Sequence, residues 1–177
     1  MIPFRQYYRC AKSLTVSPDK ELSHANFLRL PQSIDHAAQW AIHDIPALST
    51  YTRNHIAILG DAAHATTPHQ AAGAGQAIED AHVLTELLSD ARVLRREHVK
   101  SAFYAYDAIR RPRSQWVVKT SRDFGYLLSL SLDRVSGGTV SSQQILDQRL
   151  ALLWNRDIQG QAETARSVMV ENLQWIL

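Results

Sequence analysis

The sequence contains a single cysteine, Cys10, among its 177 residues, so it cannot form an intrachain disulfide. This composition is compatible with a reducing compartment. No apolar run approaches the roughly 20 residues that a membrane span requires, and the basic residues near Met1 are not followed by the apolar segment of a secretory signal. We therefore expect a cytoplasmic protein that does not associate with a membrane.

An excess of charge of one sign is also missing. The net charge is +2, with 45% hydrophobic and 20% charged residues, which is ordinary for one globular domain. We interpret the basic clustering as solvated helix ends and faces, because aromatic stacking partners for bases are not interleaved with it. This clustering consists of Arg92, Arg95, Arg96, Arg110, Arg111 and Arg113. We expect no nucleic-acid partner.

Two further chemistries lack their usual spacing. His64 and His69 are five residues apart, whereas two histidines that bind zinc from one helix face are four apart. No G-x-S-x-G sequence presents a serine nucleophile. We predict neither a metal site nor a hydrolytic triad.

Glycine is scarce, and its arrangement excludes one unit. The seven glycines contain no G-x-G-x-x-G, the pattern that lets a dinucleotide pyrophosphate meet a helix N-terminus. The nearest candidate, Gly73-Ala74-Gly75, has Ile78 where the last glycine would stand. The sequence therefore lacks the usual pyrophosphate-binding strand-turn-helix.

The clearest pattern that is present spans residues 56–88. The aliphatic run 56–59 predicts a strand buried on both faces, which Gly60 and Asp61 end. This places a carboxylate where open α/β sheets bind ligands. From Gly73 the period becomes helical, and we predict one apolar stripe. The stripe consists of Ala77, Ile78, Ala81, Leu84, Leu87 and Leu88.

Two readings of the small residues Gly73-Ala74-Gly75 stay open. A flat or anionic ligand could approach the free N–H groups of a helix's first turn, where partial positive charge gathers. Alternatively, small residues only permit tight packing of the helix. Asp61 likewise suits a ligand contact or a helix cap.

Fixed residues recur over this stretch at spacings that resemble a known family. They are Gly60-Asp61-Ala62-Ala63-His64, Pro68-His69-Gln70, Gly73-Ala74-Gly75-Gln76 and Glu79-Asp80-Ala81. The set resembles the second flavin-binding motif of the class A flavoprotein monooxygenases, in particular the salicylate hydroxylase-like aromatic hydroxylases. One departure is Ala71, where relatives usually have glycine. If the backbone there has positive φ, alanine costs about 1 kcal/mol.

The resemblance implies an activity and a site. It implies FAD as cofactor, NAD(P)H as co-substrate, and a small aromatic substrate hydroxylated with dioxygen. Gly60 and Asp61 would contact the ribityl region of FAD, and the backbone at Gly73, Ala74 and Gly75 the isoalloxazine ring. Pro68, His69 and Gln70 are the nearest candidates for substrate contact. No side chain stands out as a catalytic acid or base.

The predicted fold is mainly α with a small β component. By resemblance it is the C-terminal part of the α/β, Rossmann-like FAD-binding monooxygenase fold, without the N-terminal G-x-G-x-x-G unit. Residues 1–30 are an unassigned N-terminal segment, and residues 31–177 form that C-terminal part with a helical tail. We expect the isolated chain to be incomplete and inactive, with a homodimer or a missing N-terminal portion as its partner. The alternative is a non-catalytic, truncated or degenerate helical domain that acts through protein–protein contacts.

The remaining elements are predicted from local pattern. A helix over 31–38 precedes a strand over 39–44 that pairs antiparallel with 55–59. A long helix opens at Glu97 or His98 and is kinked or divided at Pro112. After a loop over 136–139, Ser141 begins another helix. Asp157 caps the last helix, whose apolar stripe is Ile158, Ala162, Ala165, Met169, Leu173 and Ile176.

Overall fold

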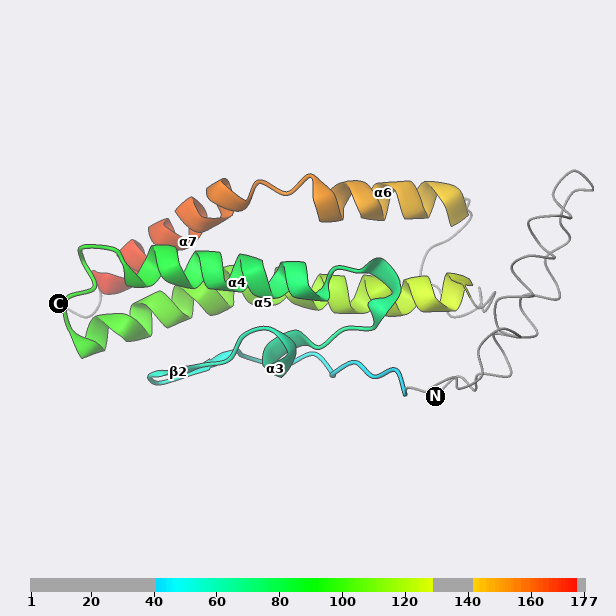
Figure 1. Cartoon of the computed structure of the whole chain (residues 1–177). Coiled ribbons are helices and arrows are strands. Elements are labelled where there is room, and N and C mark those ends of the chain that lie inside the picture. Colours follow the sequence, from blue (N-terminus) through cyan, green and yellow to red (C-terminus); the bar gives the residue numbers. More distant parts are fainter. Residues whose placement is uncertain (1–40, 129–141, 175–177) are drawn as a thin grey trace, which may run out of the picture.

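The computed structural model describes residues 41–128 and 142–174 (Figure 1). Helices dominate these residues and the sheet component is small, as the sequence predicts. That sheet is a short hairpin. The elements are β1 Thr52–Arg53, β2 Ile56–Ala57, α3 Asp61–His64, the 3₁₀ turn η3 Pro68–Gln70, α4 Gly73–Leu88, α5 Arg96–Leu128, α6 Ser142–Trp154 and α7 Ile158–Leu173. In these residues no helix is both long and apolar enough to cross a membrane.

Helices α4 and α5 form the centre of the molecule (Figure 1). Helices α6 and α7 lie on one side of this pair, and the hairpin and α3 lie on the other. The segment before the hairpin runs antiparallel to α5. Arg122 Nε donates to Asp44 Oδ2 (2.5 Å), Gln115 Nε2 to the Leu48 carbonyl (2.6 Å), and the Tyr51 amide to Asp107 Oδ1 (2.6 Å). Helix α5 therefore supports both layers.

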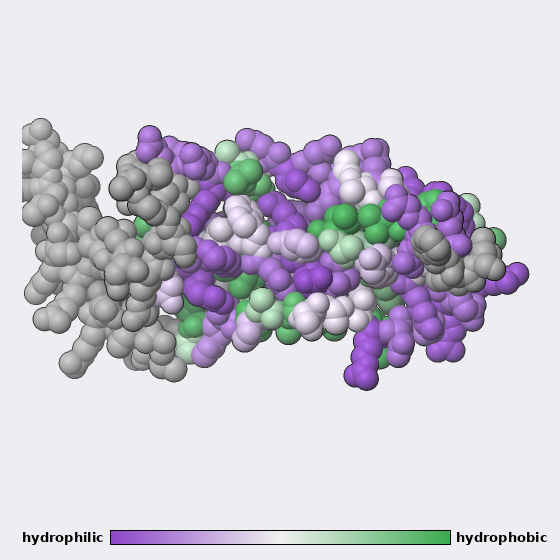
Figure 2. Space-filling model, turned by 180° about the vertical axis from the view of Figure 1, so that it is seen from behind, coloured by the Kyte–Doolittle hydropathy of each residue, from purple (hydrophilic) through white to green (hydrophobic). Residues whose placement is uncertain are grey.

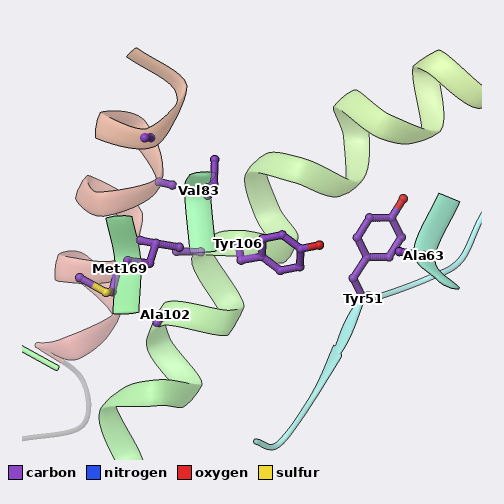
Figure 3. Close-up of a cluster of buried hydrophobic side chains, with 10 residues drawn as sticks. Tyr51, Ala63, Val83, Ala102, Tyr106 and Met169 are labelled. Atoms are coloured by element: carbon purple, nitrogen blue, oxygen red, sulfur yellow. The ribbon is translucent and has the colours of Figure 1, made fainter. Parts of the chain in front are cut away.

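The main core lies where α4, α5 and α7 meet the hairpin segment (Figure 3). Tyr106 of α5 lies between Val83 of α4 and the ring of Tyr51. The centroids of the two tyrosine rings are 6.4 Å apart. Its hydroxyl donates to the Ile58 carbonyl (3.0 Å), and Met169 of α7 closes the cluster. Burying these apolar side chains holds the layers together.

The predicted pairing of residues 39–44 with 55–59 is wrong. Residues 41–44 form no strand, while 39 and 40 lie outside the described residues. Strand β2 pairs instead with β1, with Thr52 opposite Ala57. Asn54 takes a left-handed conformation (φ 56°) that closes the chain locally. A partner strand a few residues away costs less loop entropy than a distant one.

The prediction that the strand over 56–59 is buried on both faces is also wrong. Regular pairing stops at Ala57, Ile56 is 69% exposed, and Leu59 is exposed too. An apolar run shows that a strand could be covered on both faces. It cannot show which element covers it, and within residues 41–128 and 142–174 none covers Ile56.

The predicted stripe of α4 is only partly the buried one. Leu87 is buried, but Ile78 is 69% exposed and Ala81 is exposed. The buried face instead consists of Gln76, Glu79, Asp80, Val83 and Leu87. The N-terminal half of this face is polar because ion pairs from α5 compensate the burial of its carboxylates.

The later helices follow the sequence closely. Helix α5 begins at Arg96 and continues through Pro112 as one element. Asp157 caps α7, with its side chain accepting from the Gly160 amide (2.8 Å). The α7 stripe is confirmed at Ala162, Ala165 and Met169, but not at Ile158, which is 42% exposed. The helix predicted over 31–38, the loop over 136–139, Ser141 and Ile176 lie outside the described residues.

Candidate functional site

The Gly60-Asp61 turn presents a free carboxylate. Gly60 has φ 57° and ψ −142°, a conformation that essentially only glycine adopts. Its carbonyl accepts from the amides of Ala63 and His64 (both 2.9 Å), which starts α3. The Asp61 side chain is exposed and accepts no hydrogen bond from the described residues. It is therefore available to a hydroxyl or amine donor from outside.

The N-terminus of α4 presents free backbone donors. Its N-cap, Ala72, makes no side-chain hydrogen bond, and the first turn contains no acidic residue. Gln76 is the first residue whose amide reaches the carbonyl of Ala72 (3.1 Å). The amides of Gly73, Ala74 and Gly75 thus have no helical acceptor, and they lie where the helix dipole is positive.

The structure separates the two readings of these small residues. A Cβ at Gly73 would lie 3.1 Å from Thr66 Cγ2, so tight packing accounts for this glycine. A Cβ at Gly75 would have no heavy atom within 4 Å, and Ala74 and Gly75 are exposed. Packing therefore does not account for Gly75, whereas close approach of a ligand to the backbone would.

The turn and α4 are held together directly. A Cβ at Gly60 would lie 3.4 Å from Ala77 Cβ, so the turn rests on the helix. The Gly60 amide donates to Asp80 Oδ2 of α4 (3.0 Å). The Asp61 carboxylate and the α4 N-terminus thus belong to one packed unit.

The three substrate-side candidates differ in exposure. Pro68 is exposed, His69 is half-buried, and Gln70 is buried. Thr120 donates to Gln70 Oε1 (3.1 Å), while Gln70 Nε2 has no partner among the described residues. Burial lowers the pKa of His69. Its ring packs on Gly125 of α5, where an added Cβ would collide with it.

A buried ionic network lies beneath the turn, and Arg110 of α5 is its centre. Its Nε donates to Asp80 Oδ1 (2.8 Å) and its Nη1 to Glu79 Oε2 (2.5 Å). Its Nη2 donates to the Gln76 carbonyl (3.1 Å). Arg113 Nη2 donates to the other Glu79 oxygen (3.2 Å). The Arg110 and Asp80 side chains are fully buried.

The charges in this network balance. Burial by itself would raise the pKa of Glu79, but the hydrogen bond from Arg113 and the charge of Arg110 hold it below its usual value. Burial would also raise the pKa of Asp80, but hydrogen bonds from His64 and the Gly60 amide, with the charge of Arg110, hold it low. Two guanidinium groups therefore face two carboxylates.

The sequence interpretation of Arg110 as a solvated residue is wrong. Its side chain is fully buried, and Arg113 is largely buried. Gln76, Glu79 and Asp80 are spaced so that they share one helix face with Val83. This spacing was the sign in the sequence that these polar side chains could be buried. Hydrophobicity alone assigns such a face to solvent. His64 is a buried structural histidine whose Nε2 is bonded to Asp80 (2.5 Å), a partner that the sequence did not predict.

Among residues 41–128 and 142–174, no group of three or more histidine, cysteine, aspartate or glutamate side chains is placed to hold a metal ion. The free groups of the site are the Asp61 carboxylate and the amides at the start of α4, and their chemistry indicates which ligands they could bind. An acceptor carboxylate next to free amides at a helix N-terminus suits an organic ligand with hydroxyl donors and a polar acceptor edge.

A free carboxylate beside unpaired amides at a helix N-terminus is a set of groups that suits a nucleotide- or flavin-type ligand. Residues 20–121 match the family model described as FAD binding domain. The chain belongs to this FAD-binding family. The predicted resemblance of its motifs to the class A FAD-dependent aromatic monooxygenases is confirmed by the relatives it matches.

Characterised relatives and a solved structure agree with this assignment. The chain is 40% identical over 127 residues to salicylate hydroxylase of Pseudomonas putida, covering 72% of this chain and 29% of that protein. It is 39% identical over 140 residues to 6-methylsalicylate 1-monooxygenase of Aspergillus terreus, covering 79% and 31%. A structure of a salicylate hydroxylase substrate complex superposes with a TM-score of 0.62 at 37% identity, covering 71% and 30%. The chain thus spans about a third of these relatives or less.

Proposed function

We propose that this chain supplies the part of an FAD-dependent aromatic monooxygenase that binds the ribityl and isoalloxazine portions of FAD. The observation that carries the proposal is the pairing of a free, exposed Asp61 carboxylate with the free amides of Ala74 and Gly75 on one packed unit. Membership in the FAD-binding family supports the same ligand.

Each part of the site has a distinct role in this proposal. The Asp61 carboxylate accepts hydrogen bonds from ribityl hydroxyls, and Gly60 provides the backbone turn that presents it. The Ala74 and Gly75 amides donate to the acceptor edge of the ring, next to the close packing at Gly73. The positive end of α4 stabilises negative charge there. When bound, FAD supplies the redox chemistry that activates dioxygen.

The proposed reaction hydroxylates an aromatic ring that bears a hydroxyl or carboxylate group, with NAD(P)H as reductant. The names of the relatives, salicylate hydroxylase and 6-methylsalicylate 1-monooxygenase, support this substrate class. Pro68, His69 and Gln70 are the proposed substrate-side residues, and the unpaired Gln70 Nε2 leaves a donor for an external acceptor.

These 177 residues lack one pattern that FAD-binding proteins usually contain. The sequence contains no G-x-G-x-x-G, so the pyrophosphate of FAD lacks its usual partner here. We propose that the isolated chain is inactive and that the complete reaction needs that unit from elsewhere.

A second candidate is a non-catalytic helical domain that acts by binding another protein chain, including a second copy of itself. Exposed apolar side chains favour it, because they are common at protein interfaces. They include Ile56 and Ile78 at 69% and Trp154 at 65% exposed. This candidate predicts association without any flavin.

An FAD titration of the purified chain separates the candidates. We expect a saturable change in flavin absorbance between about 370 and 450 nm, the region where flavins absorb. Asp61→Ala removes one charged hydrogen-bond acceptor and should weaken binding by about 1.5 to 3 kcal/mol, roughly 10- to 150-fold.

The matched control is Asp157→Ala, which removes an exposed carboxylate at the start of a different helix. It should lower stability and leave FAD affinity unchanged. No saturable change with the wild-type chain would contradict FAD binding and favour the second candidate. Equal affinities of wild type and Asp61→Ala would contradict the role of Asp61.

A further inference from the structure

We infer that Asp80 is a positioning residue for the flavin-binding carboxylate: it ties both ends of the one-turn helix that begins with Asp61. This inference rests on the proposed function. Asp80 itself is fully buried in α4 and therefore acts on the ligand through the Gly60-Asp61 turn.

The geometry that supports it is the convergence of two donors on one oxygen. Asp80 Oδ2 accepts from the Gly60 amide (3.0 Å) and from His64 Nε2 (2.5 Å). Gly60 is the N-cap of α3 and His64 is its last residue. Asp61 lies between these two attachment points, so its backbone cannot turn without breaking one of these bonds.

The second oxygen of Asp80 explains why the first stays in place. Arg110 Nε donates to Asp80 Oδ1 (2.8 Å), and the same guanidinium is held by Glu79 (2.5 Å) and Gln161 (3.0 Å). Helix α5 therefore prevents rotation of the Asp80 carboxylate away from Gly60. The network links the site to α5 and α7 as well as to α4.

A carboxylate suits this position better than any other side chain of its size. Three donors, from Gly60, His64 and Arg110, meet at two oxygens, and an ionised carboxylate is purely an acceptor. An asparagine would turn an N–H group toward at least one of these donors. The network therefore requires Asp80 to be charged, and it makes Nε2 the protonated nitrogen of His64.

The test compares Asp80→Asn with Glu79→Gln. Both changes replace a buried carboxylate bonded to Arg110 by its amide, but among the described residues only Asp80 accepts a hydrogen bond from the Gly60 amide. We expect Asp80→Asn to weaken FAD binding by about tenfold and Glu79→Gln to leave it near wild type. Adding Asp80→Asn to Asp61→Ala should cause no further loss, because both changes remove the same positioned acceptor.

A second readout does not need flavin. Hydrogen exchange of the Gly60 amide, measured by NMR at equal global stability, should be at least about tenfold faster in Asp80→Asn than in Glu79→Gln. If Asp80→Asn does not fold, His64→Ala removes the other donor to the same oxygen, and the same direction is expected in both readouts.

The outcomes separate the inference from the proposed function. Equal Gly60 exchange in the Asp80 and Glu79 variants, or an equal fall in FAD affinity in both, would overturn the positioning role. If the wild-type chain shows no FAD binding, the proposed function fails, and Gly60 exchange alone still decides whether Asp80 holds the turn.

Discussion

Ala71 has a left-handed backbone conformation, with φ 51° and ψ 32°, at the end of η3. The sequence indicated this position because relatives usually have glycine there, and the positive φ confirms the expectation. A Cβ in this region is strained, whereas glycine is not. We expect Ala71→Gly to raise the free energy of unfolding by up to about 1 kcal/mol, measured by urea denaturation.

Ala81→Gly is the matched control, because it makes the same chemical change at an exposed position inside α4. There glycine should lower the free energy of unfolding by about 1 kcal/mol. The two substitutions thus have opposite expected signs. A loss of stability in both would show that Ala71 carries no backbone strain.

Among single residues, sequence reasoning could place those whose position depends on local backbone features. Asp61 and Gly75 follow from a strand end and a helix start, which are local features. The buried bonds of Arg110 and His64 were missed, because their partner Asp80 lies 30 and 16 residues away along the chain. Only the packing of α5 on α4 shows that these charges are buried.

Gly125 of α5 and His69 of η3 form a contact between two elements that has a testable consequence. A Cβ at Gly125 would overlap the His69 ring at Cε1. We expect Gly125→Ala to lower the free energy of unfolding by about 1 to 3 kcal/mol, because the ring must move within a packed loop. Thermal and urea denaturation would measure this.

The same substitution in a His69→Ala background is the control. With the ring removed, alanine should be neutral or should stabilise α5 by up to about 1 kcal/mol, because alanine favours helix more than glycine does. This change of sign is the expected coupling. Equal effects in the two backgrounds would show that the ring does not limit the space at Gly125.

At the scale of elements, helices could be predicted better than strands. Helix α7 follows most of its predicted apolar period and its Asp157 cap, and both are local features of the sequence. The hairpin was missed because strand pairing depends on which partner is close in space. The buried face of α4 was misassigned because hydrophobicity counts Glu79 and Asp80 as solvent-facing, although ion pairs let them be buried.

At the scale of the whole molecule, polar and apolar groups are mixed both inside and outside. Apolar residues form small groups among hydrophilic ones on the face shown in Figure 2. Inside, a hydrophobic cluster around Tyr106 adjoins the ionic network around Arg110. Burying a charge costs free energy, and removing one partner of a buried ion pair leaves that cost uncompensated. Global stability should therefore depend on the ionisation of the network.

Acid should destabilise the folded chain through Glu79 and Asp80. Their folded pKa values lie below the usual 4.5 and 3.8, because arginine, histidine and amide donors outweigh the effect of burial. The unfolded chain therefore binds more protons as the pH falls through and below these usual values. The stabilisation is fully present above about pH 5. It is lost as the pH falls through the folded pKa values. Urea denaturation at pH 7, 5 and 3.5 would measure this loss.

Glu79→Gln tests the source of the acid sensitivity, and Glu86→Gln is its control on the same helix. At pH 7, Glu79→Gln should lower the free energy of unfolding by about 3 kcal/mol, because two buried guanidinium groups then face only the Asp80 carboxylate. Its further loss of stability between pH 5 and 3.5 should be smaller than that of the wild type.

Glu86 pairs with Arg166 at the surface (2.6 Å), where an ion pair contributes about 1 kcal/mol or less. Glu86→Gln should therefore keep the wild-type acid response. The same pH dependence in Glu79→Gln and the wild type would show that the network beneath the Gly60-Asp61 turn does not set the acid stability of the fold.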